Sequence, residues 1–214
     1  SNKGIFIDKS RRLHPKLRQF ISENFYDERL KNHDFTEKRK IIFQNKKDLL
    51  PETGIVMVDA DHKEVCRQKS EEEGKLVKGF YNKLFGSTFL DEFNTKKIMN
   101  EDDILIVAPY NVQVNYLKSI LPKGARVGTI DKFQGQQAPA TIISMTTSDP
   151  ESLPRNVDFF FSRNRLNVAV SRSQCLTIVI MNKKILDIKC NKVEHIRLVN
   201  TFMKLLDYEV HSEV

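Results

Sequence analysis

Two stretches of the chain each join a polar segment to an apolar run of strand length, and they constrain the fold most. In residues 127–145 the segment DKFQGQQ leads into the run Ala140–Ser144, and in residues 166–180 the segment Ser171–Ser173 leads into Cys175–Ile180. Apolar β-branched runs without polar alternation are typical of strands that a parallel sheet buries on both faces. Ligands bind at the polar loops that end such strands. The two stretches therefore predict an α/β domain with a mostly parallel sheet and a ligand at its loops.

The rest of the chain continues this alternation of strands and helices. Apolar runs predict three more strands, Gly54–Ala60, Ile104–Ala108 and Val127–Ile130. Ser70 followed by Glu73 has the pattern of a capping box at a helix start. The spacing of apolar residues predicts helices over residues 16–26, 71–85, 112–121, 166–172, 183–189 and 193–206. The expected inward face of the last helix consists of Val193, Ile196, Val199, Met203 and Leu206.

The polar parts of the chain have no clear periodicity. Residues 31–53 are predicted to form an excursion on the surface, residues 86–100 a connector, and residues 146–164 a long irregular loop. Residues 5–8 are expected to end a strand. No internal repeat, low-complexity segment or interdomain linker separates the expected elements. Residues 1–214 are therefore predicted to form a single domain.

The chain has a formal net charge of +7, and most of the excess lies near the N-terminus. Residues 1–50 contain 13 Lys and Arg against 7 Asp and Glu, a net charge of +6. Such basicity attracts a phosphate backbone, although an ordinary lysine-rich surface has the same composition. No apolar run reaches the roughly 18 residues of a membrane span, and three widely spaced cysteines match neither a disulfide framework nor a zinc motif. These features predict a cytoplasmic protein with no membrane partner and no metal site.

Two adjacent arginines form the first candidate site. Arg11 and Arg12 precede a helix expected to begin at Pro15, and the first turn of a helix carries positive partial charge. The arginines and this turn together could bind an anion. The alternative is that both arginines pair with carboxylates on the surface.

Polar residues after two of the expected strands form the second candidate site. Tyr110 could stack on a base or pack over the strand end, and Asn111 and Gln113 could reach a nucleic-acid backbone. In DKFQGQQ, Gly135 allows the main chain to turn sharply or to approach a ligand closely. The neighbouring glutamines offer amide donors, although a glutamine-rich loop in solvent has the same sequence.

Four motifs in this order resemble a known family. SRRLHP, VAPYNVQV, VGTIDKFQGQQ and LNVAVSRSQ are similar to motifs in the second RecA-like domain of superfamily 1 helicases. The branch they resemble contains the nonsense-mediated-decay RNA helicase and its DNA-acting relatives, and in particular the helicase half of bacterial RecB-like nuclease fusions. The motifs span residues 10–174, which is most of the chain. The resemblance implies a RecA-like three-layer domain, with a mostly parallel sheet between layers of helices.

The resemblance also implies roles for the arginines. Arg12 and Arg172 match the two arginines that reach the γ-phosphate of ATP across the cleft between two motor domains. Such guanidiniums stabilise charge as the phosphoryl group departs. The sequence departs from the family at two further positions in the expected nucleotide site. Arg11 replaces an aromatic residue that stacks on adenine, and Gln137 replaces a glutamate that contacts the sugar.

Other matched positions concern the nucleic acid and its coupling to the nucleotide. Gln134 and Gly135 match a loop that senses the nucleotide and couples it to the bound strand. Pro109, Tyr110 and Thr129 match positions that line a single-strand channel, where backbone contacts dominate and sequence is hardly read. With Asn111, which follows them on the same turn, they are the expected strand-binding residues.

The family pattern implies partners for this domain. The sequence has no GxxxxGK[ST] loop and no acidic magnesium motif. ATP with Mg²⁺ is therefore expected to bind mainly to a first RecA-like domain preceding Gly4 in a larger protein, with a nuclease further upstream. The expected substrate is single-stranded DNA, with RNA as the alternative, and the fragment alone is expected to be inactive. The competing hypothesis is a catalytically silent binding module; a nuclease has support only from Asp59 and Asp61, without a third acid.

Overall fold

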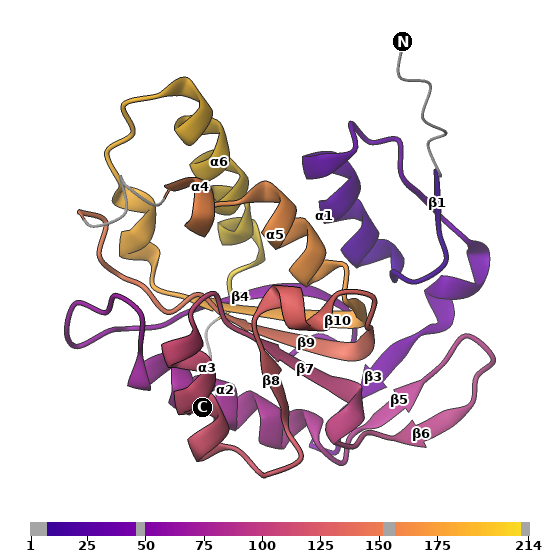
Figure 1. Cartoon of the computed structure of the whole chain (residues 1–214). Coiled ribbons are helices and arrows are strands. Elements are labelled where there is room, and N and C mark those ends of the chain that lie inside the picture. The colour runs from indigo at the N-terminus through magenta and orange to yellow at the C-terminus, as the bar shows by residue number, and fades with distance from the viewer. Residues whose placement is uncertain (1–7, 46–49, 152–156, 211–214) are drawn as a thin grey trace.

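The computed structural model describes residues 8–45, 50–151 and 157–210, and its centre is a five-stranded parallel sheet (Figure 1). Residues 5–7 of the expected first strand and residues 152–156 of the expected long loop lie outside the described residues. Every pair of neighbouring strands in this sheet is parallel, which confirms the predicted fold class. The strand order across the sheet is β4 (Gly54–Asp59), β10 (Ser173–Met181), β9 (Ala138–Ser144), β7 (Ile104–Val107) and β8 (Arg126–Gly128).

Both faces of the sheet are buried, as the unbroken apolar runs predict. Alternate residues of β7 enter different cores: Ile106 belongs to one cluster of buried side chains and Leu105 to the other. The register places Ile106 beside Ile142 of β9, and Ile142 beside Ile178 of β10. Because side chains alternate along a strand, a row of isoleucines therefore crosses one face of the sheet.

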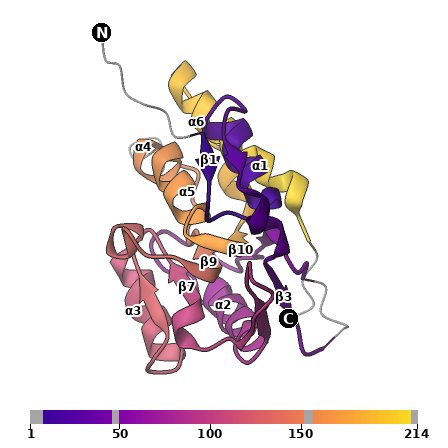
Figure 2. The ribbon, with the colours of Figure 1, turned by 90° about the vertical axis from the view of Figure 1, so that its right-hand side faces the viewer.

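Helices cover the two faces of the sheet in separate groups (Figures 1 and 2). One face is covered by α1 (Pro15–Phe25), α4 (Val157–Phe160), α5 (Arg163–Val170) and α6 (Val193–Met203). The other face is covered by α2 (Glu71–Leu84) and α3 (Asn111–Ile120). Short 3₁₀ segments complete the chain: η1 (Asp34–Lys38), η2 (Glu101–Asp103), η3 (Ile130–Phe133), η5 (Lys183–Asp187) and η6 (Lys204–Tyr208).

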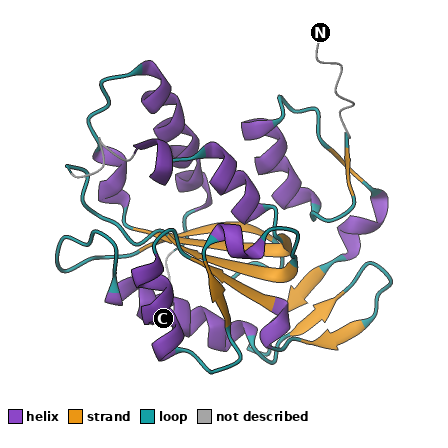
Figure 3. Cartoon of the chain, in the orientation of Figure 1, coloured by secondary structure: helices purple, strands orange, loops and turns teal. Residues whose placement is uncertain are grey.

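A second, antiparallel sheet lies beside the first, and the sequence did not indicate it (Figure 3). It consists of β3 (Lys40–Ile42), β5 (Thr88–Leu90) and β6 (Lys96–Ile98). Residues 86–100 are thus a hairpin and not a simple connector. Residues 31–53 likewise contribute β3, with Ile41 fully buried, and β2 (Lys31–Asn32), which pairs with β1 (Lys9–Ser10). Strands of two or three residues are too short to show a hydrophobic period.

The predicted inward face of the last helix is wrong in part. Val193, Ile196 and Met203 are 60%, 45% and 45% exposed, whereas Val199 and Phe202 are buried. The α-helical turn ends at Met203 and η6 continues it with 3₁₀ geometry. Val193 and Ile196 lie in the first turn of α6, where the predicted face is exposed, whereas Val199 and Phe202 further along the helix belong to the core. Over residues 183–189, the expected helix is the 3₁₀ segment η5.

The ends of two elements near the candidate site also differ from the prediction. α5 ends at Val170, so Arg172 lies after the helix and not within its last turn. At the other end, the Ser162 side chain accepts from the backbone N–H of Arg165, which starts the helix three residues earlier than predicted. β8 ends at Gly128, and Thr129 caps η3 instead of continuing the strand.

Candidate nucleotide and nucleic-acid sites

The segments that carry the two candidate arginines meet at the edge where β9 and β10 begin. The backbone N–H of His14 donates to the carbonyl of Gln174 at 2.9 Å, which fixes the SRRLHP segment to the start of β10. α1 then begins at Pro15, and the His14 side chain accepts from the N–H of Lys16. The structure thus brings together two motifs that lie about 160 residues apart in the sequence.

Arg12 is held by groups from both neighbouring loops. Its Nε donates to Oε1 of Gln137 at 2.6 Å, and its Nη1 donates to the carbonyl of Ser171 at 3.0 Å. Burial, and then the positive charge of Arg172, lower the pKa of Arg12. Two like charges held this close favour a bound anion, because an anion relieves their repulsion.

Arg172 is anchored by hydrogen bonds and does not project freely from the layer. Its Nε donates to the carbonyl of Val168 at 3.3 Å, and its Nη1 donates to the carbonyl of Gln136 at 3.1 Å. Burial lowers its pKa. The backbone of DKFQGQQ therefore supports the second arginine just as a side chain of the same loop, Gln137, supports the first.

A polar cavity of about 560 Å³ adjoins Arg12, and Arg11, Ser171 and Gln137 also line it. Two of its lining residues, Phe35 and Arg39, were not singled out from the sequence. The guanidiniums of Arg11 and Arg39 each lie 5.7 Å from the centre of the Phe35 ring.

Arg39 is a buried arginine with a partly buried partner. Its side chain is 4% exposed and pairs with Glu92 at 2.9 Å, while Nη1 donates to the carbonyl of Arg12. Glu92 lies in the hairpin of the second sheet, between β5 and β6. The second sheet therefore helps to hold the SRRLHP segment in place. The sequence held only a weak indication of this contact, namely Phe35 and Arg39 within an otherwise polar segment.

Gln134 and Gly135 are exposed and do not line the cavity beside Arg12. Gly135 has φ +80°, a conformation that residues with a side chain rarely adopt, and a Cβ built there meets no atom within 4 Å. The glycine thus serves the sharp turn after η3 in this state of the protein. The open space beside it leaves room for a ligand or another domain to approach the main chain.

The residues expected to bind a nucleic-acid strand lie at the opposite edge of the sheet, where β7 and β8 end. Pro109, Asn111 and Thr129 line one cavity of about 300 Å³, with Asp131 and Arg165 at its polar side. Tyr110 is half-buried against the core, and burial raises its pKa. Tyr110 therefore packs over the strand end, and the part that stays exposed remains accessible to a ligand.

Gln113 does not reach outward, and the expectation that it contacts a nucleic-acid backbone is wrong. Its side chain is fully buried. Its Oε1 accepts from the backbone N–H of Ser70 at 2.9 Å, and its Nε2 donates to the carbonyl of Ser70 and to Oγ of Ser144, both at 3.1 Å. Gln113 thus joins the start of α2 to the end of β9.

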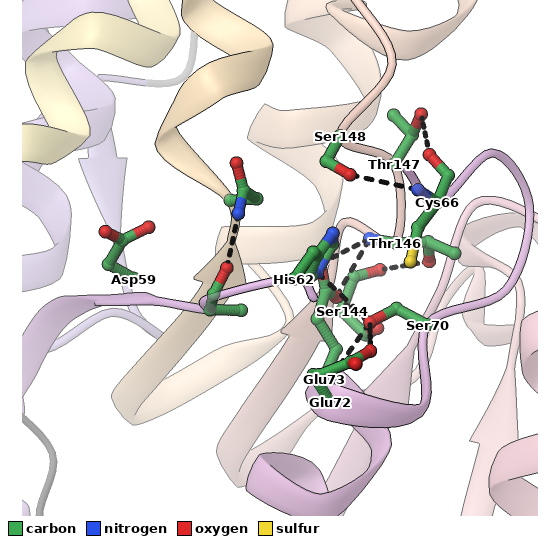
Figure 4. Close-up of polar contacts among 12 residues, drawn as sticks. Asp59, His62, Cys66, Ser70, Glu72, Glu73, Ser144, Thr146, Thr147 and Ser148 are labelled. Carbon is green, nitrogen blue, oxygen red and sulfur yellow. Dashed lines mark hydrogen bonds and ion pairs between the residues drawn. The ribbon is translucent and has the colours of Figure 1, made fainter. Parts of the chain in front are cut away.

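Glu73 lies at the centre of a buried polar network at the end of β9 (Figure 4). Its carboxylate accepts from Oγ of Ser144 at 2.6 Å and from the backbone N–H of Thr146 at 2.8 and 2.9 Å. Nε2 of His62 lies 3.2 Å from the same carboxylate. Ser70 caps α2 through Glu73 N–H, as predicted, but the carboxylate bonds to the β9 segment and not back to Ser70. The predicted capping box is therefore only half formed.

The network holds the start of the segment after β9 in an unusual conformation. Thr146 has φ +77°, which costs a β-branched residue conformational energy. The Glu73 bonds hold it there, together with a second contact in which the backbone N–H of Cys66 donates to Oγ of Ser148 at 3.0 Å (Figure 4). Met145, immediately before Thr146, lines the cavity that Pro109 and Thr129 also line. The network therefore fixes one wall of that cavity.

Neither a metal centre nor a nuclease site is found in the described part of the chain. No group of three His, Cys, Asp or Glu residues there could hold a metal ion. Asp59 accepts from the backbone N–H of Lys183 and lies 3.2 Å from its ammonium group, so it is part of a local contact with the segment after β10. The two neighbouring arginines supply positive charge of the kind that a polyphosphate binds. No helix in the described residues is long and apolar enough to cross a membrane.

Comparison with known proteins finds similarity to helicases. The chain is 27% identical over 179 residues to the DNA polymerase alpha-associated DNA helicase A of Schizosaccharomyces pombe, covering 78% of this chain and 26% of that protein. It is 27% identical over 188 residues to the ATP-dependent helicase upf1 of the same organism, covering 82% and 19%. An uncharacterized ATP-dependent helicase of Caenorhabditis elegans is 29% identical over 177 residues, covering 79% and 11%.

The chain thus spans between 11% and 26% of the length of these three relatives. All three relatives are named as helicases. Two of the names include ATP dependence, and one includes DNA. A family model described as AAA domain matches residues 1–184, which is most of the chain. The chain therefore belongs to the AAA_12 family of AAA domains, whose members here include ATP-dependent helicases.

Proposed function

We propose that this chain is the second motor domain of an ATP-dependent helicase that moves along single-stranded nucleic acid, with DNA favoured over RNA. The observation that carries the proposal is the meeting of Arg12 and Arg172 at one edge of the sheet. Each arginine comes from a different motif, and the positive charge of Arg172 contributes to the lowered pKa of Arg12, which supports one shared site. The strand-binding residues lie at the opposite edge, so one rigid sheet connects the two proposed sites.

The proposed chemistry of the arginines is charge stabilisation. ATP with Mg²⁺ supplies the phosphoryl group, and a first motor domain in the same protein would hold both. When the domains close, Arg12 and Arg172 would present guanidinium donors to the terminal phosphate. In related phosphoryl-transfer enzymes an arginine in this role contributes on the order of 10³-fold or more to turnover. The cavity beside Arg11, Arg12 and Gln137 would receive part of the nucleotide.

The test is the strand-stimulated ATPase activity of the full-length protein. We expect Arg172→Ala and Arg12→Ala each to lower turnover by roughly 10³-fold or more, while ATP binding, measured by titration with a fluorescent analogue, remains. Arg29→Ala is the matched control, because Arg29 is an exposed arginine that lines neither cavity. Unchanged turnover in both Arg12→Ala and Arg172→Ala would contradict the proposal.

A second candidate is a catalytically silent module that binds nucleic acid or protein. It is favoured by the internal hydrogen bonds of both arginines, since Gln137 and three backbone carbonyls already occupy donors that a phosphate would need. This candidate predicts salt-sensitive strand binding by the wild-type full-length protein without any turnover. The ATPase assay therefore separates the two functions before any variant is made.

A further inference from the structure

A basic groove lies along the edge strand β8, outside both sites described above. It has a volume of about 490 Å³, and four of its lining residues are cations: Lys118, Lys123, Arg126 and Lys132. None of its lining residues is acidic. We call this cavity the β8 groove. Its floor is apolar, formed by Pro122, Val127 and Phe133.

Two of the cations are held in position by contacts that leave their charge unpaired. Nη1 of Arg126 donates to the carbonyl of Asp102 at 2.5 Å, and its guanidinium lies 6.0 Å from the centre of the Phe133 ring. Nζ of Lys132 donates to the carbonyl of Val127 at 3.4 Å. Both acceptors of these donors are neutral. The ion pairs found within the described ranges include no partner for any of the four cations.

The position of the groove suggests its ligand. Thr129, a proposed strand-binding residue, follows directly after β8, and Arg126 begins that strand. At about 3.3 Å per residue, the two positions lie roughly 10 Å apart along the edge. Lys132 lies between them, because its side chain passes over Gly128, where a Cβ would come within 2.6 Å of Lys132 Cδ. A line of donors therefore runs along the free edge of the sheet from Thr129 into the groove.

We propose that the β8 groove binds the phosphate backbone of the same single strand that enters at Thr129. The proposal rests on the proposed function and extends its strand-binding surface around the edge of the sheet. Uncompensated cations on a concave surface without base-stacking groups match a sugar–phosphate backbone read without regard to sequence. Phe133 is buried in the floor and not available for stacking, so the contacts are electrostatic.

The groove also contacts the nucleotide side of the domain. Nη2 of Arg126 donates to Oε1 of Gln136, and the carbonyl of the same Gln136 accepts from Nη1 of Arg172. A phosphate that binds Arg126 would compete with the amide of Gln136. One residue of DKFQGQQ is thus shared by the β8 groove and the proposed arginine finger.

The test is binding of a fluorescent oligothymidylate of 20 nucleotides to the 214-residue chain, measured by anisotropy over a series of salt concentrations. We expect Lys118→Gln/Lys123→Gln to weaken binding several-fold and to lower the slope of log K against log salt by about 1.4, since each lost single-strand phosphate contact contributes about 0.7. Lys75→Gln/Lys78→Gln on the exposed side of α2 is the matched control, with the same change in charge and an expected slope equal to wild type.

Arg126→Gln is the second variant, and its melting curve is compared with that of wild type because Arg126 also supports Asp102 and Gln136. The lysine variants remove no described hydrogen bond, so they test the groove even if the Arg126 variant is unstable. Groove variants that bind the oligonucleotide as tightly as the control would overturn the proposal. So would polyglutamate that competes as well as a second oligonucleotide, because the groove would then be a site for an acidic polypeptide.

The result also separates this proposal from the proposed function. Loss of binding in Thr129→Val with no loss in the groove variants overturns the groove and leaves the proposed strand-binding edge intact. Loss in the groove variants alone supports the groove and contradicts the role of Thr129. A wild-type chain that binds no oligonucleotide at low salt overturns the groove proposal together with the strand-binding part of the proposed function.

Discussion

Arg12, His14 and Arg172, at the proposed nucleotide edge of the sheet, are partly buried, and burial lowers the pKa of each. Burial lowers the pKa of both Arg12 and Arg172, and for Arg12 the charge of Arg172 lowers it further. Both arginines remain charged at neutral pH, because the pKa of an arginine begins far above that range. His14, one turn away, titrates within the accessible range. Burial first, and then the positive charges of Lys16 and Arg39, lower the pKa of His14 from 6.5 to about 4.

This shift of His14 predicts a loss of stability in acid. Between about pH 4 and pH 6.5 the unfolded chain binds a proton at His14 that the folded chain does not, so the free energy of unfolding falls as the pH is lowered through this window. Urea unfolding at pH 7 and pH 4.5 should show a smaller loss for His14→Gln than for wild type. His33→Gln, with its exposed side chain, is the control and should lose as much as wild type. Equal losses in all three would contradict the role of His14.

At the scale of elements, buried polar contacts connect segments that the chain keeps far apart. Glu73 on α2 holds the end of β9, and Gln113 on α3 bonds to both. These contacts fix the position of α2 and α3 along the sheet. The apolar side chains on the inward faces of the two helices hold them against it. The cost of burying the Glu73 carboxylate is offset by three charge-assisted hydrogen bonds.

Glu73→Gln should therefore destabilise the domain by about 2–3 kcal/mol, the typical cost of losing hydrogen bonds to a buried charge. A neutral amide cannot accept from both Ser144 and Thr146 without turning its NH₂ group toward a donor. Glu71→Gln, the same substitution in the same helical turn, is the control and should change stability little because Glu71 is exposed. The measurement is the midpoint of urea unfolding. A Glu73 variant as stable as the Glu71 variant would show that the network contributes nothing.

At the scale of the whole molecule, the five-stranded sheet separates the two sets of residues for which we propose functions. The arginines lie where β9 and β10 begin, and the strand-binding residues lie where β7 and β8 end. The seven residues of β9 span roughly 23 Å at 3.3 Å per residue, so the sheet sets a fixed distance between the sets. A rigid element of this kind can transmit movement of one edge to the other when the nucleotide site closes.

The same arrangement predicts that the 214-residue chain alone does not hydrolyse ATP. It presents guanidinium groups for a phosphate but, in its sequence, no phosphate-binding loop to hold one. We expect phosphate release at the buffer background, with and without oligothymidylate, in a preparation that still binds the oligonucleotide. Turnover by wild type that Arg172→Ala removes would contradict this prediction, and the variant also identifies activity from a contaminant.

The sequence by itself determined the parallel sheet, the six helical regions in outline and the residues on which the candidate sites depend. These features are local: an unbroken apolar run, a proline at a helix start or a serine cap is recorded within a few neighbouring positions. The four motifs are local for the same reason. Their resemblance to a known family implied that Arg12 and Arg172 act on one phosphate, which we retain as a proposal.

Only the tertiary structure decided the features that depend on contacts between distant residues. The second sheet forms because three short strands pair with one another, and none of them carries a period of its own. Glu73 meets Thr146 across 73 positions of sequence, and Arg39 meets Glu92 across 53. Whether a polar side chain such as Gln113 points to solvent or into the protein depends on what packs over it, and that neighbour is chosen by the fold as a whole.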